Sequence, residues 1–174
     1  MIVTPFDKFA DFDGPSPMEK AFGSQGFADW SAKAGSLVKG VHRYIVRTRP
    51  DLSVMSKASA PKLAVVSSVH VAVGRNQDFE NYTKNEYAPV MAKGGAHYLV
   101  SQTVFGGDAN EYVTLTLRDS FAEIDKGPVP TQVLGAEGAQ KLFMKLPAGT
   151  VTHIERTIVR FVPELSIMPT DMPK

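Results

Sequence analysis

The sequence predicts an α+β protein with one complete β-α-β-β-α-β unit over residues 67–174 and a partial copy of the same unit over residues 1–55. Apolar and polar residues alternate in several short segments, as they do in half-buried strands. Helical spacing of apolar residues separates these segments. A stretch near the N-terminus also repeats a stretch near the C-terminus, which fixes the order of the elements in the partial copy.

The complete unit begins with a strand predicted at 67–73, where apolar and polar residues alternate. Asp78 can cap the helix that follows, and Phe79, Tyr82, Glu86 and Val90 have helical spacing. Gly94 and Gly95 end this helix. We therefore expect a strand and then a helix over residues 67–93.

A hairpin is predicted next, because residues 97–105 are rich in strand formers and residues 111–117 alternate again. The glycine-rich segment 106–110 supplies its turn. A main second helix is expected at 136–146 and a long last strand at 150–162, which Pro163 ends. This order is that of the split β-α-β plait, or ferredoxin-like unit.

The internal repeat aligns residues 41–55 with 154–168, with eight of the fifteen positions identical. Upstream, Gly23 matches Gly135 and Gly26 matches Gly138 at an offset of 112. We interpret residues 1–55 as a strand-helix-strand part of a second copy, 56–66 as a linker and 67–174 as the complete copy.

Met1 aligns with Val113, in the middle of an expected strand. This position suggests that the native N-terminus lies further upstream, with about 45 residues of strand-helix-strand pattern preceding Met1, by analogy with the second copy. The alternative is a true half unit that another subunit completes.

The composition excludes several classes of function. Nineteen Lys and Arg residues against eighteen Asp and Glu residues form no basic block, so we expect neither nucleic acid nor a membrane as a partner. The chain has no cysteine, which excludes disulfides and thiolate chemistry. The N-terminus lacks a signal-peptide pattern, so a cytoplasmic location is the default expectation, subject to the native start.

The element order, the long last strand and the tandem copies resemble the dimeric α/β-barrel superfamily, which includes antibiotic-biosynthesis-monooxygenase-like, NIPSNAP-like and EthD-like domains. The resemblance covers residues 67–165 fully and 1–55 in part, and no diagnostic motif accompanies it. It implies tandem ferredoxin-like plaits whose sheets pack face to face into a barrel, within the chain or in a homodimer. The superfamily includes cofactor-free oxygenases, isomerases, haem-dependent enzymes and proteins without an assigned activity, so the fold does not select a reaction.

In such barrels a ligand cavity lies between the paired sheets. Alternation predicts that Val69 and Val71 pack on the helices and that His70 points to the inner face. In the third strand we expect Val113 on the helix side and Tyr112 on the inner side. His70 is the first candidate catalytic residue, as a general base or hydrogen-bonding group, with a histidine satisfied by its neighbours as the alternative.

His42 and Glu155 occupy matched positions of the two copies, so we predict an orienting pair across a pseudo-twofold axis, with a simple interface ion pair as the alternative. Together with His70 they form the expected catalytic set. The expected ligand-binding residues share strand faces with them or lie near the cavity mouth: His153, Tyr44, Tyr98, Gln102 and Tyr112.

No cofactor is expected. The chain has neither an HExxH motif nor a two-histidine, one-carboxylate spacing, so no metal site is predicted, and no motif identifies an axial haem ligand. The sequence predicts a protein that binds a small organic molecule and that could be a cofactor-independent enzyme of the monooxygenase or isomerase type. The alternative is a non-catalytic structural or assembly protein of the same fold. Whether the chain is an enzyme stays open.

Overall fold

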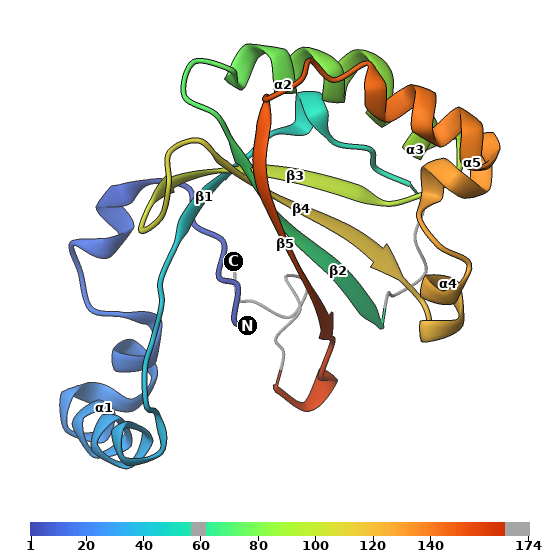
Figure 1. The fold of residues 1–174 in the computed structure, drawn as a ribbon. Helices are drawn as coiled ribbons and strands as arrows, with labels where there is room; N and C mark the ends of the chain where they lie inside the picture. The colour runs from blue at the N-terminus through green and yellow to red at the C-terminus, as the bar shows by residue number, and fades with distance from the viewer. Residues whose placement is uncertain (57–61, 166–174) are drawn as a thin grey trace. The chain divides into compact units, whose positions relative to one another are not determined.

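A computed structural model describes residues 1–56 and 62–165 of the chain (Figure 1). The chain divides into two compact units, Met1–Arg43 and Tyr44–Lys174. Residues 57–61 of the predicted linker, and the repeat positions after residue 165, lie outside the described residues. These two units are defined by how compactly the chain folds, whereas the predicted boundary at residue 55 comes from the sequence repeat. The boundary at residue 55 therefore stays a prediction.

The first unit contains a short 3-10 helix, η1 (Phe9–Phe12), and the helix α1 (Pro17–Leu37). Ser16 caps α1, because its hydroxyl accepts a hydrogen bond from the Glu19 backbone N–H at 3.1 Å. Gly23 interrupts the helix with φ 70° and ψ 166°, a conformation that is nearly restricted to glycine. No residue of α1 is buried.

The second unit is built on a five-stranded antiparallel sheet in the order β1-β3-β4-β2-β5. The strands are β1 (Ile45–Thr48), β2 (Leu63–Val71), β3 (Tyr98–Phe105), β4 (Glu111–Arg118) and β5 (Val151–Arg160). The α+β class and the strand-helix-strand-strand-helix-strand order predicted for the second copy are confirmed. The first strand predicted for the partial copy is not formed, because residues 1–8 contain no strand and do not pair with the sheet. β2 begins at Leu63, four residues before the predicted start, so the end of the predicted linker is strand.

The sheet is not closed into a barrel. β1 and β5 lie at its two edges, and closure would require these edge strands to be joined by hydrogen bonds, directly or through further strands. Within the described residues the expected barrel is therefore not formed by this chain alone.

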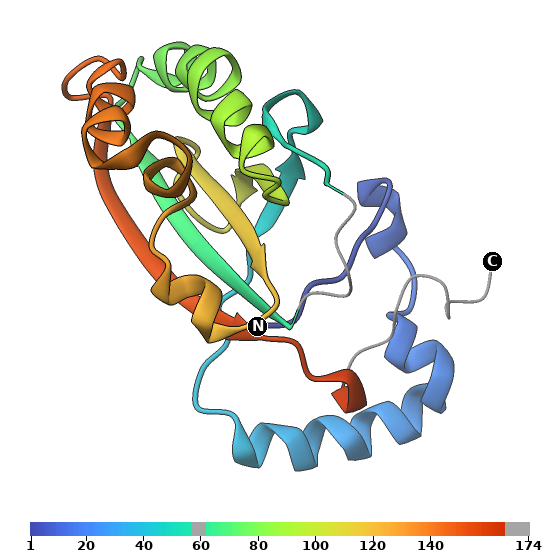
Figure 2. The same cartoon turned by 90° about the vertical axis from the view of Figure 1, so that its right-hand side faces the viewer.

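The helices of the second unit cover one face of the sheet (Figure 1, Figure 2). The first group follows β2 and runs as α2 (Asn76–Tyr82), a π-helical turn η3 (Thr83–Tyr87) and α3 (Ala88–Lys93). Because Pro89 lacks an N–H and would clash with a carbonyl of a regular preceding turn, the wider π turn suits this position. The second group, between β4 and β5, comprises α4 (Phe121–Asp125) and α5 (Val129–Met144).

The hydrophobic core lies between this helix layer and the sheet. Two short 3-10 helices, η2 (Pro50–Leu52) and η4 (Pro163–Leu165), follow β1 and β5. Leu52 is buried in the core, so the segment after β1 is packed together with the complete unit. The other buried members of the core are Val69, Val71, Phe79, Met91, Ala96, Tyr98, Val100, Tyr112 and Val129.

The strand register corrects one prediction about side-chain direction. Val69 pairs with Tyr112, and directly opposed residues share a face of the sheet. Tyr112 is therefore on the helix side, fully buried, with its ring centroid 4.7 Å from that of Phe79. The predicted direction of β4 is wrong, because both of its faces carry residues that can be buried and alternation alone does not say which face meets the helices.

A charged network ties the end of β1 to the helix layer. The Arg49 guanidinium donates to both oxygens of the Glu80 carboxylate, one of these bonds measuring 2.9 Å, and also donates to Asp51 at 2.8 Å. The Tyr112 hydroxyl donates to Glu80 at 2.6 Å. The Arg49 hydrogen bonds lower the pKa of Glu80 and of Asp51 below the usual carboxyl range.

Candidate functional site

The candidate site is a group of polar side chains on the face of the sheet that the helices of the second unit leave open. It is set by register: His70 on β2 pairs with Glu111 on β4 and with His153 on β5. Opposed residues share a face, and so do residues two apart on one strand. The group comprises Ser68, His70, Thr103, Glu111, His153 and Glu155.

His70 is at the centre of the group, and its side chain is 29% exposed. Its Nε2 lies 3.5 Å from the Ser68 hydroxyl oxygen, and its Nδ1 lies 3.7 Å from a carboxylate oxygen of Asp108. Each ring nitrogen therefore faces an oxygen atom. Its ring centroid is 5.7 Å from that of His153 on the neighbouring strand. The predicted direction of His70, away from the helices, is confirmed.

Asp108 belongs to the turn between β3 and β4, which the sequence did not single out as part of a site. The backbone N–H of Asn110 donates to its carboxylate at 2.9 Å and lowers the pKa of Asp108 below its usual range, with a smaller contribution from His70. Nδ1 of His70 is the ring nitrogen nearer this carboxylate, and Nε2 is the ring nitrogen on the side of Ser68.

Glu111 supplies a second carboxylate, which is buried. It accepts hydrogen bonds from the Ser68 hydroxyl and, at 3.0 Å, from the Thr103 hydroxyl. The turn approaches it closely at Gly107, where a Cβ atom would lie 2.9 Å from a Glu111 carboxylate oxygen and 3.2 Å from the Tyr44 ring. Tyr44, one of the predicted ligand-binding residues, thus borders the same turn.

His153 and Glu155 extend the group onto the edge strand. Both are exposed, and Nε2 of His153 lies 3.2 Å from a carboxylate oxygen of Glu155. The two residues are two positions apart on β5, so they share one face of the strand, as predicted. Both side chains are accessible to a molecule that approaches the open face.

Three predicted ligand-binding residues lie on the other side of the sheet. Tyr98 is buried in the core, with its ring centroid 5.4 Å from that of Tyr87, and burial raises its pKa. Gln102 is on the same face as Tyr112 and accepts a hydrogen bond from Arg47 at 3.4 Å. Tyr98, Gln102 and Tyr112 therefore do not contribute side chains to the open-face group.

His42 lies in the first unit and is exposed. Its pairing with Glu155 stays a prediction. The sequence did not single out four residues of this site: Ser68, Thr103, Asp108 and Glu111. Their common feature is that they are brought to His70 by strand pairing and by the hairpin turn, which no local pattern encodes.

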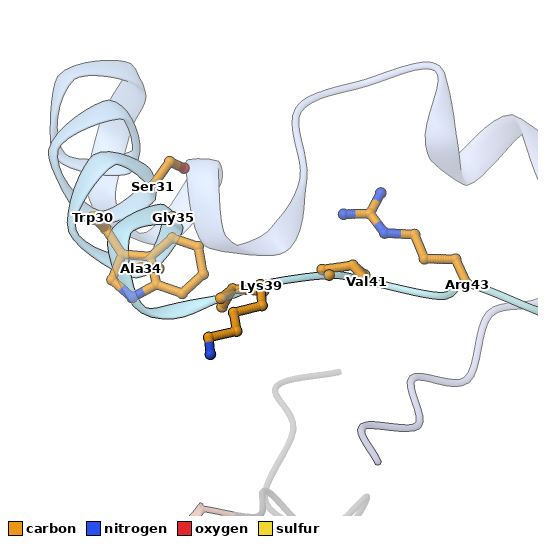
Figure 3. Close-up of a pocket in the computed structure, with 9 residues that line it drawn as sticks. Trp30, Ser31, Ala34, Gly35, Lys39, Val41 and Arg43 are labelled. Carbon is orange, nitrogen blue, oxygen red and sulfur yellow. The ribbon is translucent and has the colours of Figure 1, made fainter.

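The first unit has a shallow pocket of about 340 Å³ at the end of α1 (Figure 3). Trp30, 43% exposed, contributes its indole ring, and Lys39 and Arg43 contribute positive charge. Its other lining residues are Ser31, Ala34, Gly35, Val38, Gly40 and Val41. Trp30 matches the buried Leu142 of α5 at the offset of 112, so this pocket marks an uncovered apolar helix face.

No family model matches the chain, and no curated protein matches its sequence. Among the described residues, no group of three or more His, Asp or Glu side chains is placed to hold a metal ion. No helix in the part of the chain that the structure describes is long and apolar enough to cross a membrane.

Proposed function

We propose that the chain binds a small organic molecule on the open face of its sheet, and that His70 hydrogen-bonds or deprotonates this molecule without a cofactor. The observation that carries the proposal is the setting of His70. Its imidazole is partly exposed, Nδ1 faces a carboxylate and Nε2 faces a hydroxyl. This arrangement fixes one nitrogen as the base and directs it along the open face.

Asp108 makes the proposed base effective. When His70 accepts a proton at Nε2, the resulting imidazolium gains a favourable interaction with the carboxylate near Nδ1. A ligand with an acidic O–H or C–H group could therefore transfer a proton to His70 with no metal or redox group. This chemistry suits the isomerase or monooxygenase type that the sequence resemblance implies.

We also propose that the second unit is a ferredoxin-like plait with a partial copy before it. The order β3-β4-β2-β5, with helices on one face, supports the plait. Two local matches support the copy. Gly23 in α1 and Gly135 in α5 have nearly the same backbone angles, φ 70°, ψ 166° and φ 71°, ψ 174°, and η2 and η4 both begin at a proline.

A plait with one bare sheet face is best completed by a second plait. We propose self-association of the chain through the open face, in a homodimer, which would place the His70 group between two sheets. Enclosure would exclude water from a bound molecule and strengthen its polar contacts with His70 and Glu155.

A second candidate function is assembly without catalysis. The edge strand β5 favours it, because Ile154 and Ile158, on the helix side of that strand, are both exposed. Long edge strands with apolar side chains are common sites of association. In that case His70 would be satisfied by its neighbours in the assembled protein and would bind no small molecule.

Side-chain NMR of ¹⁵N-labelled histidines tests the proposal directly, because the chain has four histidines. Titration with a panel of small phenols and ketones should shift the ring signals of His70 and His153 saturably. His97 is the internal control, since its Nδ1 lies 3.2 Å from the Ser56 carbonyl, away from the open-face group. If the ring signals shift with protein concentration but with none of the compounds, the result would favour assembly and contradict ligand binding.

The variant His70→Gln provides the second arm of the test. Glutamine keeps polarity and much of the volume but has no basic ring nitrogen. It should abolish the saturable shift of His153, whereas the matched variant His97→Gln, which removes the ring beside the Ser56 carbonyl, should leave it unchanged. Equal ligand affinity in the wild type and His70→Gln would refute the role of His70.

A further inference from the structure

Ser68 has two proton acceptors within reach on the open face. Its hydroxyl donates to the buried Glu111 carboxylate, and its oxygen lies 3.5 Å from Nε2 of His70. Ser68 and His70 are two residues apart on β2, so the strand itself holds both side chains on one face. A serine in contact with a basic imidazole nitrogen is the usual arrangement for an activated hydroxyl nucleophile.

The third member of such an arrangement orients the base, and Asp108 is placed to do so. It lies 3.7 Å from Nδ1, on the opposite side of the ring from Ser68. Nucleophile, base and orienting carboxylate thus follow one another as Ser68, His70 and Asp108. Catalytic groups of this kind are recognised by geometry and roles and occur on unrelated folds in different chain orders.

We propose that Ser68 is an acyl-accepting nucleophile and that the molecule bound on the open face is an ester. The inference rests on the proposed binding site, because it uses the same His70. It goes beyond that proposal by assigning a covalent step and a substrate class.

Transfer of the acyl group from the ester to Ser68 needs no cofactor. The Ser68 hydroxyl first turns from Glu111 to Nε2 of His70. Its oxygen then forms a bond to the ester carbonyl carbon while its proton passes to Nε2. The carbon–oxygen bond to the alcohol then breaks, and the alcohol leaves with the proton from Nε2. Water adds to the acyl-serine in the same way and releases a carboxylic acid, which regenerates the Ser68 hydroxyl.

Two further residues have positions suited to this step. Glu111 keeps the serine oxygen in place, because the Thr103 hydroxyl fixes its other carboxylate oxygen at 3.0 Å. His153, whose ring lies 5.7 Å from that of His70, is the neighbouring side chain that can donate to the oxyanion of the tetrahedral intermediate.

The negative charge of the open-face group limits the class of substrate that it can bind. Three carboxylates, from Asp108, Glu111 and Glu155, surround the two imidazoles of the group. Such a surrounding repels anionic substrates. The hydroxyl stands on a sheet face, next to the strand that carries His153. Uncharged esters fit the charge of this site best.

Covalent labelling with a fluorophosphonate tests the nucleophile. Attack by Ser68 displaces fluoride, and mass spectrometry of the intact chain and of its peptides should find one adduct, on Ser68. Ser68→Ala should remove it. The matched control is Ser67→Ala, because Ser67 precedes Ser68 directly but pairs with Thr114 on the helix side of the sheet. Labelling that persists in Ser68→Ala, or that is found on Ser67, would overturn the proposal.

The rate of fluorophosphonate labelling tests the role of His70. His70→Gln should slow labelling by about 100-fold or more, the usual contribution of a general base. Asp108→Asn should also slow labelling, because it removes the carboxylate that orients the imidazole. Glu111, Glu155 and His153, the other titratable groups facing His70, are unchanged in this variant.

Turnover is measured with p-nitrophenyl acetate, an uncharged short-chain ester. We expect a burst of one p-nitrophenol per chain followed by slower release, and neither in Ser68→Ala. If that variant fails to fold, Ser68→Cys and Ser67→Cys replace it, since each introduces the only thiol of the chain. Iodoacetamide should then modify position 68 faster than position 67, and adding His70→Gln should slow the reaction at position 68 and leave that at position 67 unchanged.

The outcomes separate the two proposals. Saturable shifts of His70 with ligands, but no Ser68 adduct and no burst, would overturn acyl transfer and leave small-molecule binding standing. Absence of shifts, adduct and burst together would overturn both. A Ser68 adduct whose rate is equal in wild type and His70→Gln would show a reactive serine without the proposed base, and would refute the mechanism.

Discussion

Replacement of Arg49 by methionine is expected to destabilise the second unit by about 2–3 kcal/mol. The Arg49 side chain is 18% exposed and that of Glu80 is 20% exposed. Methionine retains most of the apolar stem but removes both hydrogen bonds to the Glu80 carboxylate. Breaking one side of a fully buried ion pair costs about 3–5 kcal/mol, and an exposed pair contributes about 0–1 kcal/mol. The partial exposure of this pair places the estimate between these limits.

Most of this cost should come from the carboxylate that loses its partner. In Arg49→Met, Glu80 keeps the Tyr112 hydroxyl as a donor but has no compensating guanidinium. The double variant Arg49→Met, Glu80→Gln removes the unpaired charge, so it should recover at least half of the lost stability. The recovery distinguishes an electrostatic cost from a loss of packing around the arginine stem.

The assay is urea unfolding followed by far-UV circular dichroism, with hydrogen exchange of β1 and β3 peptides to locate the change. Asp51→Asn is the matched control, because Asp51 also accepts from Arg49 but is 45% exposed. It should cost less than about 1 kcal/mol. An Arg49→Met variant no less stable than Asp51→Asn, or a double variant as unstable as Arg49→Met, would refute the reasoning.

Two further predictions concern pH and backbone conformation. Because Arg49 lowers the pKa of Glu80 in the folded chain, the stabilisation by this group is present above the pKa of an unfolded glutamate, about 4.3, and is lost as pH falls through the folded value. The stability difference between the wild type and Glu80→Gln in urea unfolding should therefore shrink below about pH 4.3, and a constant difference would contradict this. Gly135→Ala should cost about 1–3 kcal/mol in the same assay, because φ 71° and ψ 174° suit only glycine even though space for a Cβ is available. Gly35→Ala, at a regular helical position of α1 with free space, should instead increase helicity, and equal effects would rule out backbone strain as the cause.

The order of elements in the second unit could be predicted from the sequence because each element has a local signal. Alternation located β2 and β5, and placed His70 and His153 on the face away from the helices. The same rule failed for β4, where Tyr112 and Val113 are both compatible with burial. The choice is made by pairing with Val69, which is a contact between distant segments.

The candidate site was predictable only in part for the same reason. His70 is distinctive in the sequence, but its partners are not. Asp108 lies in a hairpin turn where an aspartate usually serves the turn itself, and it does so here through Asn110. Glu111 is the first residue of a strand, where a charged side chain is expected to be exposed to solvent. Only the register of β2 with β4, and the fold of the turn over Gly107, bring these carboxylates to Ser68 and His70.

Helices α1 and α5 show why a hydrophobic pattern does not by itself determine burial. Both are interrupted by a glycine of nearly the same conformation, at matched positions. α5 lies on the sheet, and Ala139 and Leu142 are buried. Their counterparts at the offset of 112 are Phe27 and Trp30, yet no residue of α1 is buried. The hydrophobic pattern indicates which face of a helix can be buried. Whether that face is buried depends on whether another surface packs against it. The exposure of the Trp30 indole therefore does not by itself indicate a ligand site.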